Sequence, residues 1–147
     1  TGDTFITLSI ANLVRISGVA DLNFGTYSGS GDISRDDDVC IWTNHSAGNY
    51  KVLAQGDGDS HAFTVKTLGE ETIAYSVRWN NSTGTTGNSQ LTADQLSADF
   101  SGASTTSSTC GGGSTANFQV LFAQDDLLSV RPGTYTGVLK FIISPAA

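Results

Sequence analysis

The sequence predicts an all-β protein whose strands pack as a β-sandwich, and three observations lead to this fold class. Thr, Ser, Gly, Val and Ile, which favour strands and loops, are abundant among the 147 residues, unlike the residues of helical bundles. Short segments alternate apolar and polar residues with the period of two that half-buried strands show. Turn-forming residues separate these segments, of which about seven are expected, in one domain without internal repeats.

The N-terminal half contains short strands and one polar loop. Residues 4–10 form the first expected strand, because Ile6, Leu8 and Ile10 alternate with polar residues. Apolar residues continue through 13–16 and 22–24, and the Gly, Ser and Asp residues of 28–38 predict a loop. Further strands are expected at 39–43, 49–54 and 62–65.

Residues 72–79 show the clearest alternation in the chain, with Ile73, Tyr75, Val77 and Trp79 on one face. Both Tyr75 and Trp79 are therefore expected in the core, as is Trp42 in an earlier strand.

A long polar segment, 80–116, separates this strand from the C-terminal part of the domain. Because structureless loops of this length are uncommon, we expect the segment to contain an irregular edge strand, pinned by Cys110, and a weak helical turn around 92–96. Beyond it we expect a strand at 117–123, a helical turn within 124–130 and a last strand at 135–143. This last strand is apolar on both faces, as in the middle of a sandwich.

Charge and hydrophobicity exclude several classes of function. The net charge is −7 with only 7 Lys and Arg residues, too few for a basic face that binds nucleic acid or anionic lipid. No apolar run approaches the roughly 20 residues of a membrane helix, so we expect a protein that is not membrane-embedded.

Cys40 and Cys110 are consistent with one disulfide bond, which would indicate an exported protein, or with two buried free thiols. The chain opens at Thr1 without an initiator methionine, which fits a removed signal peptide or a fragment boundary.

Residues for catalysis are sparse, and we expect no enzyme and no cofactor. His45 and His61 lie beside loop-type residues, and no nucleophile or metal-ligand motif occurs. The acidic clusters 36–38 and 57–59 have oxygen ligands suited to Ca²⁺ but lack the spacing of the twelve-residue calcium loop. We interpret them as solvated loops, and calcium binding stays an open alternative.

The two ends of the chain carry the strongest functional pattern. Ile6, Leu8 and Ile10 begin almost at the N-terminus and could fill pockets in the groove of a sheet. Such a segment either pairs within its own domain or completes the sheet of another subunit, and the pattern alone does not separate these alternatives.

Several short motifs resemble the spore coat protein U family, which includes the subunits of archaic chaperone–usher pili. The resemblance covers nearly the whole chain through four stretches in the family's order, namely 16–27 (ISGVADLNFGTY), 38–42 (DVCIW), 48–52 (GNYKV) and 132–139 (PGTYTGVL). The family often has a cysteine just before the first stretch, where this chain has Arg15 and Ile16. That departure leaves Cys110 as the partner of Cys40.

The resemblance implies an immunoglobulin-like sandwich, residues 13–147, that lacks one strand and receives it from the next subunit. Residues 1–12 would be the donor segment, with Phe5, Ile6, Leu8 and Ile10 as donor residues. The acceptor groove would be lined by Val14, Ile16, Leu22, Tyr135, Leu139, Phe141 and Ile143. The implied partners are identical or related pilus subunits, a periplasmic chaperone and an outer-membrane usher. The protein would reach a cell-surface pilus through the periplasm and support adhesion or biofilm formation.

Two other classes of function stay open. A tip adhesin would bind a surface through loops, above all residues 80–116, and a secreted carbohydrate-binding module would expose an aromatic patch.

Overall fold

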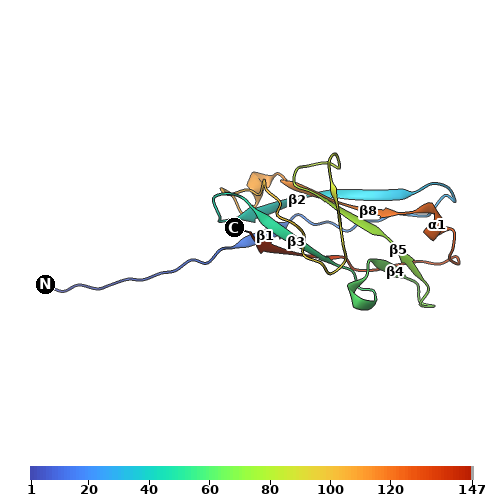
Figure 1. Cartoon of the computed structure of the whole chain (residues 1–147), viewed down its shortest axis with the longest axis horizontal. Helices are drawn as coiled ribbons and strands as arrows, with labels where there is room; N and C mark the ends of the chain where they lie inside the picture. Colours follow the sequence, from blue (N-terminus) through green and yellow to red (C-terminus); the bar gives the residue numbers. More distant parts are fainter. Residues whose placement is uncertain (147) are drawn as a thin grey trace.

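The computed structural model describes residues 1–146, and nearly all of its regular structure is β (Figure 1). Its strands are β1 (Val14–Ser17), β2 (Ile33–Thr43), β3 (Tyr50–Gln55), β4 (Thr64–Lys66), β5 (Thr72–Ala74), β6 (Ser76–Asn80), β7 (Ser89–Leu91), β8 (Ala116–Phe122) and β9 (Lys140–Pro145). The short helix α1 (Gln124–Leu127) and two 3₁₀ turns, η1 (Asp59–His61) and η2 (Cys110–Gly112), lie in the connections.

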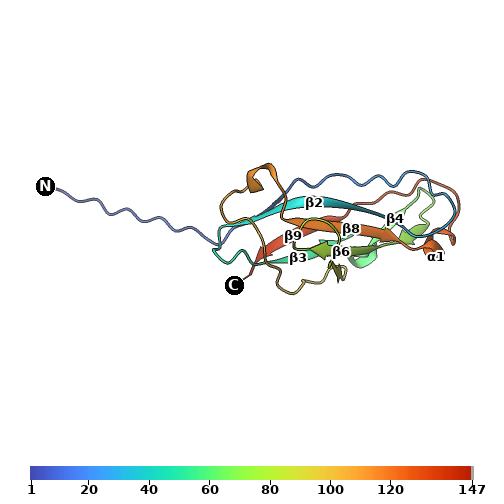
Figure 2. The same cartoon turned by 90° about the horizontal axis from the view of Figure 1, so that it is seen from above.

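Two layers of strands face each other: in Figure 1, β2 and β8 lie above β3 and β4, and Figure 2 looks down onto the layers. One layer is a five-stranded antiparallel sheet with the order β1-β2-β8-β6-β7. The other contains the pairs β3–β9 and β4–β5. The segment 94–100 extends this second layer beyond β3, because the N–H groups of Asp94, Ser97 and Phe100 donate to carbonyl groups of β3. The structure therefore confirms the predicted all-β sandwich.

The core lies between the layers and is built around one aromatic pair. Trp79 on β6 and Tyr50 on β3 are both fully buried, and the indole N–H of Trp79 donates to the Tyr50 hydroxyl at 3.0 Å. Val39 and Ile41 of β2 and Val52 of β3 are also fully buried around them. Alternation along the strands places these side chains on the inner face, as the sequence predicts.

Trp42 was expected in the core, but it is half-buried on the outer face of β2. Ile41 and Thr43 on either side of it are fully buried and occupy the inner face. Because neighbouring residues of a strand point to opposite faces, Trp42 shares the outer face with Cys40 and not with the core residues.

The loop expected at 28–38 is wrong from residue 33 onward. Residues 33–39 pair with β8 along its whole length, from Ile33 opposite Phe122 to Val39 opposite Ala116. The acidic side chains remain compatible with a strand because Asp36 and Asp38 accept hydrogen bonds from the Asn117 side chain on the outer face. A long-range partner thus outweighs the local turn preference of Asp and Ser.

Two other expected strands differ in their extent. The strand expected at 72–79 divides into β5 and β6 at Tyr75, whose N–H donates instead to the carbonyl of Phe63. Its faces are as predicted, with Ile73, Val77 and Trp79 buried. The last strand is regular only from Lys140, and the preceding residues make a single bridge between Thr136 and Lys66.

The long polar segment is irregular, as expected, and contains β7, η2 and isolated bridges at Phe100 and Ser104. The helical turn predicted around 92–96 is wrong: the N–H of Gln95 donates to the carbonyl of Thr92 in a plain turn. The helical turn expected within 124–130 is confirmed as α1.

Candidate functional site

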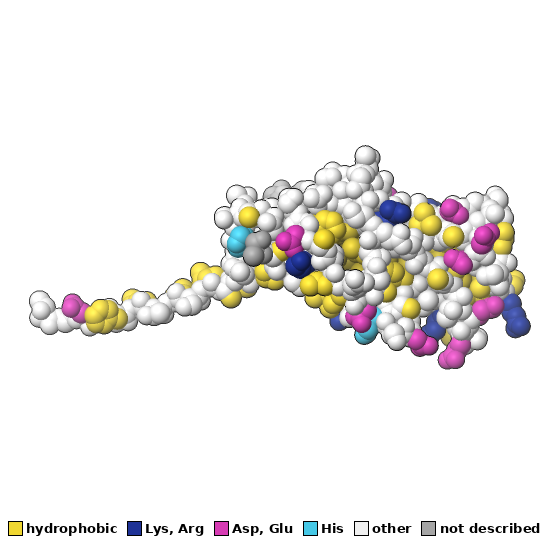
Figure 3. Space-filling view, in the orientation of Figure 1, with side chains coloured by type: hydrophobic (Ala, Val, Ile, Leu, Met, Phe, Trp, Pro, Cys, Tyr) yellow, Lys and Arg dark blue, Asp and Glu magenta, His cyan; other side chains and the backbone are white. Residues whose placement is uncertain are grey.

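The N-terminal segment, residues 1–12, extends away from the sandwich and contains no regular secondary structure (Figure 1). The strand expected at 4–10 is therefore not formed within this chain. Its apolar side chains are almost fully exposed, with Phe5 at 95 %, Ile6 at 89 %, Leu8 at 82 % and Ile10 at 72 %. Figure 3 shows hydrophobic side chains exposed along the thin extension. Burying one of these side chains in an apolar environment would contribute roughly 1.5–3 kcal/mol of favourable free energy.

The extension leaves the domain beside β2, where Asn44 holds its last residues. The N–H of Leu13 donates to Asn44 Oδ1 at 2.7 Å, and Asn44 Nδ2 donates to the Ala11 carbonyl at 2.9 Å. The backbone N–H of Asn44 donates in turn to the Leu13 carbonyl at 3.2 Å. Residues 11–13 therefore have a defined path at the pole that also holds the C-terminal end of β9 (Figure 1).

Within the described chain, the C-terminal segment 136–145 makes backbone hydrogen bonds with other strands along one of its two edges only. Thr136 exchanges two backbone hydrogen bonds with Lys66, and the N–H of Val138 donates to Asp57 Oδ2 at 3.0 Å. From Lys140 onward β9 pairs with β3. No strand of residues 1–146 lies on the other side of β9. A strand edge of this kind presents unpaired N–H and C=O groups to a further strand.

The open edge of β9 faces the other layer at β1, which is itself the edge strand of the five-stranded sheet. Apolar side chains from both borders point to the core between them but remain only half-buried. They are Ile16, Leu22 and Phe24 on one border and Tyr135, Leu139, Phe141 and Ile143 on the other. These side chains pack against the core but stay partly exposed beside the unpaired edge of β9.

Of the seven residues predicted to line an acceptor groove, six are half-buried and pack against the core. Val14 is the exception: it is half-buried on β1 but does not belong to the side chains that pack against the core. Phe141 contacts two buried rings of the core, with its ring centroid 5.3 Å from that of Trp79 and 4.9 Å from that of Phe118. The sequence prediction omitted Phe24, whose ring lies 5.0 Å from that of Phe122. Its alternation with Leu22 is the signal that would have found it.

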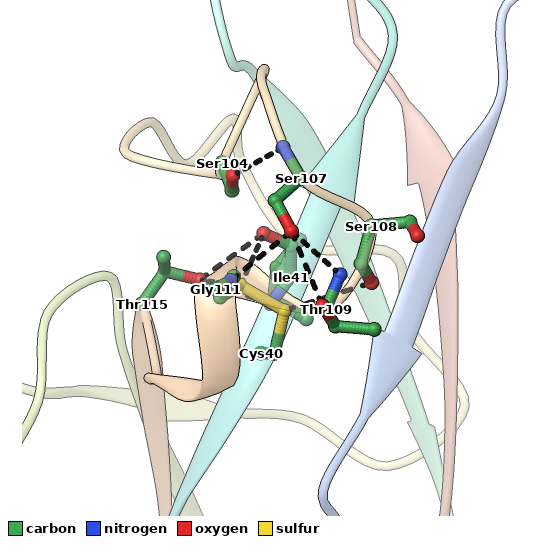
Figure 4. Close-up of a disulfide and its surroundings, with 9 residues drawn as sticks. Cys40, Ile41, Ser104, Ser107, Ser108, Thr109, Gly111 and Thr115 are labelled. Carbon is green, nitrogen blue, oxygen red and sulfur yellow. Dashed lines mark hydrogen bonds between the residues drawn. A yellow bond between two sulfur atoms is a disulfide. The ribbon is translucent and has the colours of Figure 1, made fainter.

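Cys40 and Cys110 form a disulfide bond with their Cα atoms 5.9 Å apart, which confirms the predicted pairing and excludes two free thiols. Figure 4 shows the bond with the hydroxyl network around it. Thr115 Oγ1 donates to the Ile41 carbonyl, and the N–H of Gly111 donates to Ser107 Oγ. The disulfide thus ties the end of the polar segment to β2, on the outer face of the sheet.

The acidic cluster of β2 serves a structural purpose in this fold. Asp38 accepts hydrogen bonds from the Gly84 N–H and from Asn117, and these two donors lower the pKa of its carboxyl group. Among residues 1–146 no three His, Cys, Asp or Glu side chains gather in a way that could hold a metal ion. No helix of the described chain has the length and apolarity to cross a membrane.

Aromatic side chains are mostly turned inward. Trp79 is fully buried and Tyr75 is half-buried, with its ring stacked on that of Phe63 at 5.6 Å. In the described part of the chain, Phe5 is the one aromatic residue that is fully exposed. No surface patch of stacked aromatic rings, of the kind that binds sugars, is therefore visible in residues 1–146.

Comparison with known proteins supports the fold. No protein-family model matches the chain, and no curated protein matches it. A solved structure described as a chaperone–tip adhesin complex of CFA/I fimbriae biogenesis matches with a TM-score of 0.62 and 14 % sequence identity. The match covers 91 % of this chain and 43 % of the other, so the chain spans less than half of that protein. The likeness shows a pilin-like β-sandwich fold.

Proposed function

We propose that the protein is a structural subunit of an extracellular pilus, and that it polymerises by donor-strand exchange through its N-terminal segment. One observation carries the proposal: the same chain has an unpaired apolar segment, residues 4–10, and an unpaired edge of β9 bordered by half-buried apolar side chains, which together form the proposed groove. Each supplies what the other lacks. The backbone groups would extend the β3–β9 pair, and Ile6, Leu8 and Ile10 would cover the half-buried core.

The open edge is long enough for the donor segment. It covers the ten residues 136–145, and the donor residues fall within the seven residues 4–10. In an extended strand every second side chain points the same way, so Ile6, Leu8 and Ile10 would all face the groove. An interface between a segment and a groove on another copy does not close on itself, and repetition generates a filament.

The proposal includes helper proteins and a location. An open groove of apolar side chains would aggregate unless another protein occupied it before assembly. A periplasmic chaperone would take this place and an outer-membrane usher would catalyse the exchange, in line with the chaperone complex of the structural neighbour. The finished filament would lie at the cell surface and support adhesion or biofilm formation.

Deletion and substitution of the N-terminal segment test the proposal. We expect removal of residues 1–12 to abolish filaments seen by electron microscopy, while the remaining domain still binds a chaperone. Leu8→Asp would place a charge in the groove and block assembly too. Thr7→Asp is the matched control, because residue 7 points away from the groove in the same strand. Filaments of normal length from Leu8→Asp, or a truncated chain that is stable without a chaperone, would contradict the assignment.

A second candidate function is that of a pilus-tip adhesin, which the tip adhesin in the neighbouring structure favours. Such a subunit would bind its surface through the polar segment 80–116, whose end is held by the disulfide. Shortening the exposed loop 82–87 would then weaken adhesion of the isolated protein to glycan or plastic surfaces without changing filament length. For a structural subunit the same change would leave adhesion of the monomer unaffected.

A further inference from the structure

Asn44 occupies a position where the β1–β2 ladder ends but the N-terminal segment continues. The ladder pairs Val14 with Thr43 and is extended by the bond from the Asn44 N–H to the Leu13 carbonyl. After Asn44 the chain of β2 turns away, because the N–H of His45 donates to Thr43 Oγ1 and that of Gly48 to the His45 carbonyl. Residues 11 and 12 have no further backbone of β2 beside them.

The side-chain amide of Asn44 takes the place of the missing peptide group. It accepts from the Leu13 N–H and donates to the Ala11 carbonyl, as a residue of a neighbouring strand would. Only one orientation of the amide satisfies both partners, so its oxygen and nitrogen are assigned by the two bonds. Residues 11–13 are therefore extended and directed out of the molecule.

This direction matters for the choice between the groove of the same chain and that of another copy. β1 runs from Val14 into the body of the domain, and the N-terminal segment runs away from it at the same pole (Figure 1). To enter its own groove the chain must reverse between residues 10 and 14. A tight reversal needs turn geometry at residues 11–13, which the bonds to Asn44 oppose.

A segment tethered beside the groove of its own chain has a high effective concentration there, which favours insertion into that groove over the groove of another copy. Assembly between copies therefore requires a feature that opposes insertion within one chain. We propose that Asn44 is a positioning residue that keeps the N-terminal segment out of its own groove and directs it to a second copy of the chain. This inference rests on the proposed function, since it assumes that residues 4–10 enter the groove at all.

Thiol cross-linking of the full chain tests the inference. Cysteines introduced together as Leu8→Cys and Leu139→Cys, with the native disulfide left oxidised, are joined by a flexible bismaleimide. Insertion within one chain yields a linked monomer, and insertion between copies yields a ladder on a denaturing gel. Cross-linking of this cysteine pair is compared between the protein with no further substitution and the variants Asn44→Ala, Asn44→Asp and Asn12→Ala. Asn12→Ala is the control, because Asn12 is an exposed residue of the same segment.

We expect Asn44→Ala to raise the ratio of linked monomer to ladder by about fivefold to tenfold over Asn12→Ala, as expected for the loss of bonds to the segment. Asn44→Asp retains an acceptor for Leu13 but loses the donor to Ala11, so its ratio should be intermediate. Circular dichroism would check that each variant is folded, and Asn44→Asp serves as the second variant if Asn44→Ala unfolds.

Two negative results are distinguishable. An equal ratio in Asn44→Ala and Asn12→Ala, with the ladder present in both, would overturn the role of Asn44 and leave the proposed function in place. Neither linked monomer nor ladder in the unsubstituted background would overturn the proposed function, and the role of Asn44 with it.

Discussion

At the scale of single residues, the core depends on polar atoms that are buried but paired. Tyr50 lies at the centre, fully buried, with its hydroxyl accepting the indole N–H of Trp79. Burial raises the pKa of Tyr50 to about 12, because an anionic phenolate would lose its hydration there. Burial and the nearby charge of Asp57 raise the pKa of Tyr75 to about 12 as well.

These shifts predict that the protein loses stability in alkali. The pKa of a tyrosine in the unfolded chain is about 10, so the unfolded state releases its proton first as the pH rises. The free energy of unfolding should be flat with respect to Tyr50 below pH 10. It should then fall by roughly 1.4 kcal/mol per pH unit until the folded pKa near 12 is reached. Tyr75 acts in the same direction but more weakly, because it is partly exposed.

Urea denaturation at pH 8, 10 and 11 measures this slope. Tyr50→Phe is the control variant and should remove most of it. That variant should also be less stable at pH 8 by about 1–3 kcal/mol, since the Trp79 N–H loses its buried acceptor. A slope that is equal in both proteins would contradict the assignment to Tyr50.

At the scale of elements, β2 joins the features that shape the domain. Its first half pairs with β8 and its second half with β1, and it carries one end of the disulfide. The bond closes a sequence separation of 70 residues and ties η2 to the sheet. A cross-link over such a long loop restricts the unfolded chain strongly.

Replacing both cysteines by alanine should therefore destabilise the domain by about 4 kcal/mol in the chain-entropy model. The measurement is the denaturant midpoint of Cys40→Ala/Cys110→Ala against the parent protein, each with and without a reducing agent. Reduction should lower the midpoint of the parent and leave that of the variant unchanged. Parent and variant with the same midpoint under oxidising conditions would show that the loop is held by its hydrogen bonds alone.

At the scale of the whole molecule, the sandwich is closed on one side and open on the other. At the side of β3, the segment 94–100 adds further backbone pairing. At the side of β9, no strand of residues 1–146 closes the gap, and the apolar side chains on its borders stay half-buried. The proposed function takes the missing strand from another copy, so a free strand of the same sequence should compete for the groove.

A synthetic peptide of residues 1–12, added in excess to the full chain, should shorten filaments and raise the denaturation midpoint. At a peptide concentration of 100 times its dissociation constant, the gain in unfolding free energy would be about 2.7 kcal/mol. The matched control is the same peptide with Leu8→Asp, which should do neither. Equal effects of both peptides would mean that the binding does not depend on the groove-facing side chains.

Local patterns account for much of this fold. Alternation from Ile73 to Trp79 correctly assigned the inner face of β5 and β6, and the two cysteines correctly indicated the disulfide. The alternation at 4–10 singled out the segment that the structure leaves exposed. The predicted secondary structure was wrong where pairing with a distant segment determines it. Residues 33–38 were predicted as a loop from their acidic, turn-forming residues, but pairing with β8 makes them a strand.

By itself, then, the sequence determined the all-β class, the side chains that face inward on most strands, and the apolar face of the N-terminal segment. These properties are local, because residue type and a period of two suffice to express them. The tertiary structure alone decided that β9 has a free edge, that Asn44 holds residues 11–13, and that residues 4–10 stay unpaired. These properties depend on which strands meet across long separations in the chain, and a local pattern cannot specify that.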